Sequence, residues 1–99
     1  MANFRLSGNK AFIGGDLTVG SAGALKNFLL TLSHTKHKEI IVDLNGIERW
    51  DSSAIQLFVS WLKGNPSLPV TWRNMPPDLV ADIRLIGLAK LFNEVSHEQ

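Results

Sequence analysis

The sequence contains no cysteine, has almost no net charge and includes no long hydrophobic run. Without cysteine the chain forms no disulfide and offers no thiolate to a metal, so a reducing compartment is permitted. Ten basic against nine acidic side chains leave a net charge of +1, which provides no basic field for nucleic acid. No apolar segment approaches the ~18 residues that a membrane-spanning helix requires. We therefore expect no nucleic-acid partner and no insertion into a membrane.

The first residues also lack the pattern of a signal peptide, so we expect a cytoplasmic protein. A chain of 99 residues corresponds to one domain, residues 1–99. Its hydrophobic content of 44% is typical of a soluble globular protein. One modest core is therefore expected, without disulfide or metal support.

Motifs that bring chemistry to a small domain are also absent. The sequence has no phosphate-binding loop of the Walker or GxGxxG type. His34 and His37 stand at the end of a predicted helix, where cations are favourable, and no third metal ligand is evident. Asp16, Asp43 and Asp51 are separate carboxylates, and Asp43, inside an apolar strand, is expected to be hydrogen-bonded to a neighbouring loop or helix start. We expect a protein that is not an enzyme and holds no metal or cofactor.

The rest of the chain is organised around one strand, one loop and one helix. Residues 40–44 place four branched aliphatic side chains around a single aspartate, which is typical of a strand covered on both faces. Asn45-Gly46 ends this strand. The triplet 51–53, Asp-Ser-Ser, contains the residue types that satisfy free N–H groups at a helix start. The helix is expected to begin at about Ser52, with Ser53 as its cap.

The apolar arc of this helix is unusually wide. At about 100° per residue it covers roughly 200°, whereas packing on one sheet needs little more than 100°. The arc consists of Ala54, Ile55, Leu57, Phe58, Val59, Trp61 and Leu62. One flank is therefore expected to meet a neighbouring helix or a partner protein. Ser52 lies at the border of the arc, where we expect solvent to reach it, and its neighbours there are Gln56, Val59 and Lys63.

Two short strands and a helix are predicted before this segment. The strands lie around residues 4–6 and 11–13, joined by a turn at Gly8-Asn9. Gly14-Gly15 weakens the second strand and indicates a bulge or a close backbone approach. Apolar residues then recur at helical spacing over residues 22–32.

A strand and two helical pieces are predicted after it. Residues 64–66, Gly-Asn-Pro, end the long helix, and residues 68–73 alternate as a fourth strand. Residues 76–78, Pro-Pro-Asp, open a helix, since proline and aspartate suit its first turn. Residues 88–92 form one further helical piece, and residues 96–99 are expected to be frayed. The inner stripe of the third helix is expected to consist of Leu79, Ile83 and Ile86.

The order is therefore strand, strand, helix, strand, helix, strand, helix, helix. Short connections between strands and helices force right-handed crossovers and at least partly parallel pairing. The pattern indicates an α/β layer fold in a single domain.

Three segments resemble the landmarks of one known family. Val42-Asp-Leu-Asn-Gly-Ile-Glu-Arg-Trp-Asp-Ser-Ser-Ala-Ile55 resembles the signature of STAS domains, named for sulfate transporters and anti-sigma-factor antagonists. Gly15-Asp-Leu-Thr-Val19 is similar to an earlier segment of that family, and Leu85-Ile-Gly-Leu-Ala-Lys-Leu-Phe92 to its closing segment. The resemblance implies a small mixed four-stranded sheet with helices packed mainly on one face. Ala54 and Gln56 stand where the family usually has glycines.

The resemblance also implies a regulatory role for one serine. In anti-sigma-factor antagonists the first serine after this aspartate is phosphorylated by a cognate serine kinase, and Ser52 is the matching position. The chain would then dock a serine-kinase anti-sigma factor and release it on phosphorylation. The partner-binding surface is expected to consist of Trp50, Asp51, Ser52, Ser53, Gln56, Val59 and Lys63.

Two alternatives remain open. Ser52 is also explained by a plain role in starting the helix. Stand-alone STAS domains further resemble the small subunit that binds the ATPase of phospholipid-trafficking ABC transporters, where the same helix face is a permanent contact. Of the tryptophans in this region, Trp61 is expected in the core, whereas Trp50, in the loop before the cap, is the better candidate for an exposed contact.

Overall fold

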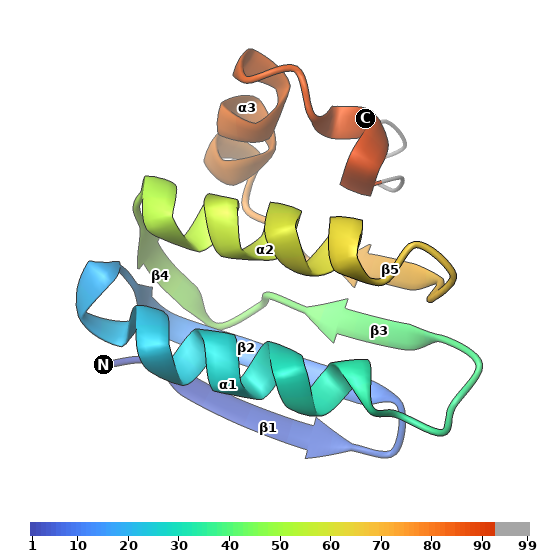
Figure 1. Cartoon of the computed structure of the whole chain (residues 1–99). Coiled ribbons are helices and arrows are strands. Elements are labelled where there is room, and N and C mark those ends of the chain that lie inside the picture. Colours follow the sequence, from blue (N-terminus) through green and yellow to red (C-terminus); the bar gives the residue numbers. More distant parts are fainter. Residues whose placement is uncertain (93–99) are drawn as a thin grey trace.

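The computed structural model describes residues 1–92, in which a mixed five-stranded sheet is covered on one face by two long helices (Figure 1). Strands β1 (Asn3–Ser7) and β2 (Lys10–Leu17) form an antiparallel hairpin. Its turn contains Gly8, whose φ of +61° lies in the left-handed region that glycine adopts without strain. The predicted hairpin is confirmed.

Two further strands extend the sheet in parallel. β3 (Ile40–Asp43) pairs with β2, and β5 (Val70–Arg73) pairs with β3. The order is β1-β2-β3-β5, so β2 lies inside the sheet and the crossovers run through the helices. Side chains alternate between the two faces, and the face under the helices buries Ala11, Ile13, Ile40, Val42, Val70 and Trp72.

A fifth strand occupies part of the segment expected to be a loop. β4 (Ile47–Trp50) pairs in parallel with the end of β2, beyond a register shift between Gly15 and Asp16. The shift confirms the predicted bulge. Gly15 has a φ of +78°, and its N–H donates to the carbonyl of Gly46 across 2.8 Å. The four-stranded sheet expected from the sequence was therefore one strand short, because β4 pairs only after the bulge has redirected β2.

Helices α1 (Ala22–Ser33) and α2 (Ser52–Gly64) lie side by side on the same face of the sheet (Figure 1). A short 3₁₀ turn, η1 (Val19–Ser21), precedes α1. The wide apolar arc of α2 is confirmed, since the sheet and α1 together cover most of it. The buried residues of α2 are Ala54, Ile55, Phe58, Trp61 and Leu62. Trp61 is thus a core residue, as predicted.

The last described elements, α3 (Pro77–Leu85) and η2 (Ala89–Phe92), lie beyond α2 on the side away from α1 (Figure 1). The predicted start of α3 at paired prolines is confirmed. Ile86, however, is 53% exposed rather than part of the inner stripe, because the helix has ended and Gly87 follows with a φ of +76°. The predicted fraying of residues 96–99 lies outside the described residues.

An aromatic cluster joins η2 to the sheet and to α2. The ring of Trp72 lies 5.0 Å from that of Phe92 and 5.1 Å from that of Phe58, measured between centroids. Trp61 meets Trp72 edge-on at 6.4 Å. These contacts complete one continuous core. Within residues 1–92, no helix has both the length and the apolar character needed to cross a bilayer.

Candidate docking surface at the start of α2

Asp51 is the residue that caps α2. Its backbone is extended, and its Oδ1 accepts hydrogen bonds from the N–H of Ser53, at 3.0 Å, and from the Ser53 hydroxyl. Its Oδ2 accepts from the N–H of Val19 at 2.9 Å, and its own N–H donates to the carbonyl of Leu17. The prediction that Ser53 caps the helix was wrong, because the carboxylate reaches the free N–H and holds the Ser53 hydroxyl as well. Asp51 thus joins the start of α2 to the end of β2 through its backbone and to the following turn, which begins at Val19, through its side chain.

These contacts set the charge of the site. The hydrogen bond from the Ser53 hydroxyl, followed by those from the backbone N–H groups of Val19, Ser53 and Ala54, lowers the pKa of Asp51 below its ordinary value of 3.8. Partial burial opposes this shift and is outweighed. Asp51 is therefore a carboxylate at neutral pH, next to the exposed Ser52.

Ser52 is exposed and occupies the first position of α2. Its hydroxyl makes no hydrogen bond to any other residue of the described chain, 1–92. The capping contacts belong to Asp51 and Ser53, so the Ser52 hydroxyl is free to meet an enzyme or a partner. The sequence-based expectation of a solvent-accessible Ser52 is confirmed.

The other residues predicted to bind a partner divide into two groups. Gln56 and Lys63 are exposed and Val59 is half-buried, and together with Ser52 they form one strip along α2. We call these four residues the α2 strip. Ser53 is half-buried beside the cap.

Trp50 does not belong to that exposed surface. It is half-buried at the end of β4, and its indole N–H donates to Oδ2 of Asp82 on α3 across 2.8 Å. The expectation of an exposed aromatic contact was wrong, because α3 folds back over this position. Trp50 instead holds α3 against the segment that leads into α2.

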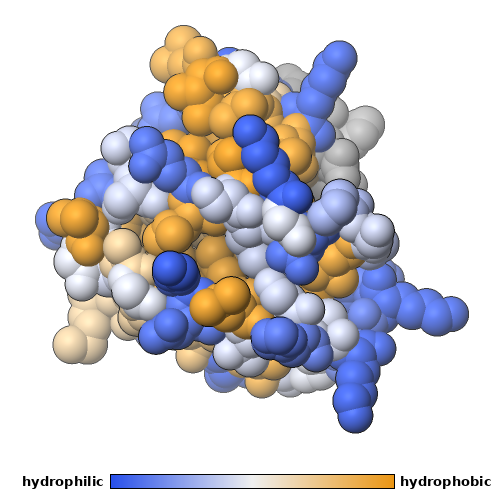
Figure 2. Space-filling view, in the orientation of Figure 1, coloured by the Kyte–Doolittle hydropathy of each residue, from blue (hydrophilic) through white to orange (hydrophobic). Residues whose placement is uncertain are grey.

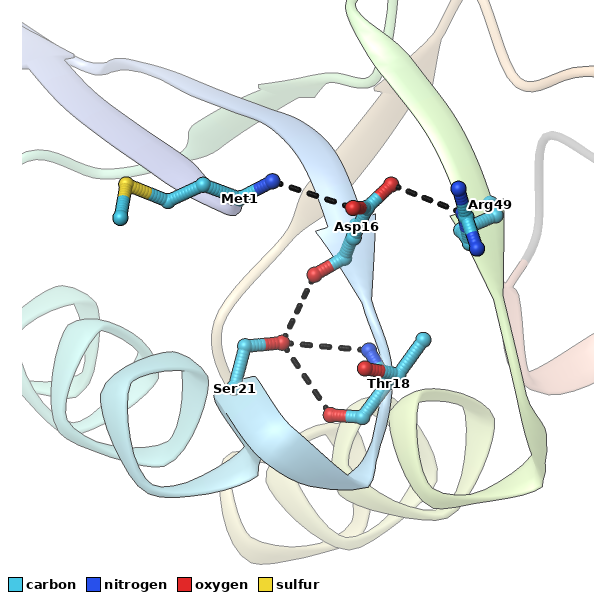
Figure 3. A network of polar contacts seen from close by, with 5 residues as sticks. All are labelled: Met1, Asp16, Thr18, Ser21 and Arg49. Atoms are coloured by element: carbon cyan, nitrogen blue, oxygen red, sulfur yellow. Dashed lines mark hydrogen bonds and ion pairs between the residues drawn. The ribbon is translucent and has the colours of Figure 1, made fainter.

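Sequence reasoning also missed a polar network around Asp16, shown in Figure 3. Its Oδ2 lies 3.0 Å from the amino group of Met1 and its Oδ1 lies 3.1 Å from Nε of Arg49 on β4. The Ser21 hydroxyl accepts from the N–H of Thr18 at 3.1 Å and donates toward the carbonyl of Asp16, 2.8 Å away. The hydrogen bond from the Met1 ammonium is the main reason that the pKa of Asp16 lies below its ordinary value. The Gly-Asp dipeptide was visible, but its partners come from distant segments.

Asp43 is hydrogen-bonded, as predicted from its place in an apolar strand. Its Oδ1 accepts from the N–H of Asn45 at 2.8 Å and from Nδ2 of Asn74 at 3.1 Å. Asn74 has a φ of +57°, so this contact also holds the turn after β5. Across residues 1–92, no three histidine, cysteine or carboxylate side chains gather as a metal site would require.

The fold and the α2 strip together define a small α/β module with an exposed polar surface at the start of α2. The family model described as "Mlab, STAS domain" matches residues 6–93. The chain therefore belongs to the STAS domain family, as its sequence resemblance suggested.

Fifteen chains of solved structures match this chain. One, titled "Crystal Structure Analysis of Mglu", has 19% sequence identity and a TM-score of 0.58. The match covers 76% of this chain but only 19% of that one. At this identity the likeness shows the fold alone. No curated protein matches the chain.

Proposed function

We propose that this protein is a regulatory binding module that docks a partner protein through the α2 strip and is switched by phosphorylation of Ser52. The supporting observation is that the residues that cap α2 do not include Ser52. Asp51 and Ser53 satisfy the cap, whereas the hydroxyl of Ser52 is exposed and has no partner in residues 1–92. A hydroxyl in this position is accessible to a kinase without any unfolding of α2.

Phosphorylation of Ser52 would act on binding rather than on folding. A phosphate adds about −1.5 to −2 charge at neutral pH. At the first position of a helix this charge is favoured by the helix dipole, so α2 would tolerate it. A partner that covers the α2 strip would instead have to desolvate the phosphate beside the carboxylate of Asp51. A loss of a few kcal/mol at such an interface lowers affinity by about two decades or more.

The proposed partner is a serine-kinase anti-sigma factor. Exposed Ser52, Gln56 and Lys63 would contact it directly, with half-buried Val59 and Ser53 at the margin. Asp51 and Trp50 would hold the loop in place through their bonds to Val19 and Asp82. The module itself would carry out no catalysis.

The test is phosphorylation by the cognate kinase with ATP, followed by mass spectrometry of the intact protein. One added phosphate is expected, and Ser52→Ala should abolish it. Ser53→Ala is the matched control and should still be phosphorylated, because the Ser53 hydroxyl is engaged by Asp51. Ser52→Asp should weaken kinase binding, and unchanged binding would show that the switch is wrong.

A second candidate is an accessory subunit that binds the ATPase of a phospholipid-trafficking ABC transporter. Half-buried Val59 and Leu57 on either side of the exposed surface of α2 favour a permanent contact, which needs no modification. Affinity capture followed by mass spectrometry distinguishes the two. Recovery of an ABC ATPase by both the unmodified protein and Ser52→Ala would support this candidate. Recovery mainly of GHKL-type kinases would eliminate it.

A further inference from the structure

A groove separates the outer surfaces of α1 and α2. It has a volume of about 400 Å³, and its walls are mainly Leu29 and Leu30 of α1 and Leu57 and Trp61 of α2. Leu30 is 49% exposed despite its size. Figure 2, in the orientation of Figure 1, shows hydrophobic side chains between α1 and α2 with hydrophilic ones around them. The groove is thus an apolar surface in contact with water.

Three polar side-chain groups that line the groove are already hydrogen-bonded within the chain. The hydroxyl of Ser33 accepts from the indole N–H of Trp61 at 3.0 Å and from Nδ2 of Asn65 at 3.1 Å, and donates to the carbonyl of Leu29 at 3.1 Å. Nδ2 of Asn65 also donates to the carbonyl of Trp61. Covering the groove with apolar side chains would therefore leave none of these groups without a partner, which removes the main cost of burial.

The charged side chains of the two helices that form the groove have one sign. Neither α1 nor α2 contains an acidic residue. Lys26 and His34 line the groove itself, and exposed Lys36 and Lys38 follow the end of α1. A partner that covers the leucines would bring its flanking groups against these lysines, so acidic flanks are complementary.

We propose that the groove binds an amphipathic helix of a partner protein, with an apolar stripe between Leu30 and Leu57 and acidic residues facing Lys26. From Lys26 to His34 the groove follows eight residues of α1, about 12 Å at 1.5 Å per residue. That length matches about two turns of an apposed helix, whose anchors recur at i, i+3, i+4 and i+7. This is a second surface, because Ser52 lies about 140° around α2 from Leu57.

Other occupants fit the groove less well. It is open to solvent along its outer side, whereas small-molecule sites bury about 70–90% of the ligand. A single acyl chain would therefore remain partly in water. A flat lipid surface would reach Leu30 but not buried Leu29 and Trp61, which side chains projecting from a helix would reach.

The test uses two designed helical peptides labelled with fluorescein, in fluorescence polarisation with the whole protein. Both have leucine at i, i+3, i+4 and i+7, and they differ only in glutamate or lysine at the flanking positions. The glutamate peptide should bind about tenfold more tightly or better. Lys26→Glu should reverse this preference, whereas Lys10→Glu, on β2, should leave the glutamate peptide favoured.

Removal of the apolar wall gives an independent measurement. Leu30→Ser should lower affinity for the glutamate peptide about tenfold. Leu85→Ser is the matched control, since Leu85 is 85% exposed at the end of α3 and lines no part of the groove. In ¹⁵N chemical-shift mapping of the complex, the largest changes should fall on the residues that line the groove.

Equal binding of the two peptides, equal loss in Leu30→Ser and Leu85→Ser, or shifts centred elsewhere would overturn the proposal. It would also be overturned if the groove residues instead mediated self-association or bound anionic phosphatidylglycerol vesicles, with no peptide binding. Ser52→Asp should leave peptide affinity unchanged. A positive peptide result with a negative kinase result would therefore reject only the phosphorylation switch.

Discussion

The indole N–H of Trp50 and the Oδ2 of Asp82 are joined by a 2.8 Å hydrogen bond between residues 32 positions apart. Trp50 is the last residue of β4 and immediately precedes the cap of α2, whereas Asp82 lies within α3. Both side chains are half-buried. This single contact therefore ties the position of α3 to the segment that presents Ser52.

Replacement of this donor should destabilise the fold. Trp50→Phe keeps an aromatic ring but removes the N–H, and we expect the free energy of unfolding to fall by about 1–3 kcal/mol, since the bond is to a charged group. Asp82→Asn, which retains an acceptor oxygen, should cost less. Urea denaturation measures both. Equal stability of Trp50→Phe and the parent protein would contradict a structural role for the bond.

Loss of the cap should be more damaging than loss of the neighbouring hydroxyl. Asp51→Ala removes the acceptor for Ser53 and Val19 together, and we expect the melting temperature to fall by about 5 °C or more. Ser52→Ala should melt close to the parent protein, because Ser52 is exposed and its hydroxyl makes no hydrogen bond within residues 1–92. Thermal unfolding followed by circular dichroism distinguishes the two variants. A lower melting temperature for Ser52→Ala than for Asp51→Ala would show that Ser52, not Asp51, is the cap.

Stability should fall in acid because of two carboxylates. The folded-state pKa values of Asp16 and Asp51 are lowered, by the Met1 ammonium and the Ser53 hydroxyl respectively. Their contribution is therefore complete above the unfolded pKa, near 3.8, and is lost as the pH falls below it through the folded values. In urea denaturation at successive pH values, Asp51→Asn should show a shallower acid loss than the parent protein. An identical slope would mean that Asp51 does not titrate as described.

Two glycines should respond oppositely to alanine. At Gly15, with a φ of +78°, an added Cβ would lie 1.9 Å from the carbonyl oxygen of Met1, so Gly15→Ala should destabilise by about 1–3 kcal/mol. At Gly23, in α1, an added Cβ meets nothing within 4 Å, so Gly23→Ala should stabilise by about 0.4–1 kcal/mol. Chemical denaturation of the pair tests the bulge. A tolerated Gly15→Ala would show that the bulge does not need glycine.

Local patterns were sufficient for most elements of the fold. The Gly8-Asn9 turn, the apolar strand 40–44 and the proline-rich start of α3 appear where the residue types place them. The predicted arc of α2 contains all of its buried side chains, although Leu57 and Val59 within it are half-buried, and Ser52 at its border reaches solvent as predicted. These features depend on periodicity and capping, which act over a few residues.

The tertiary structure decided what depends on distant partners. β4 pairs in parallel with β2 only beyond the register shift at Gly15 and Asp16. Trp50 is half-buried because α3 packs near it and Asp82 accepts its indole N–H. Asp51, rather than the predicted Ser53, caps α2, and its carboxylate also accepts a hydrogen bond from the N–H of Val19 in a distant segment. The sequence alone therefore determined most of the helices and strands and the exposure of Ser52. The fifth strand, the capping residue and the partial burial of Trp50 depended on contacts between segments that no local pattern encodes.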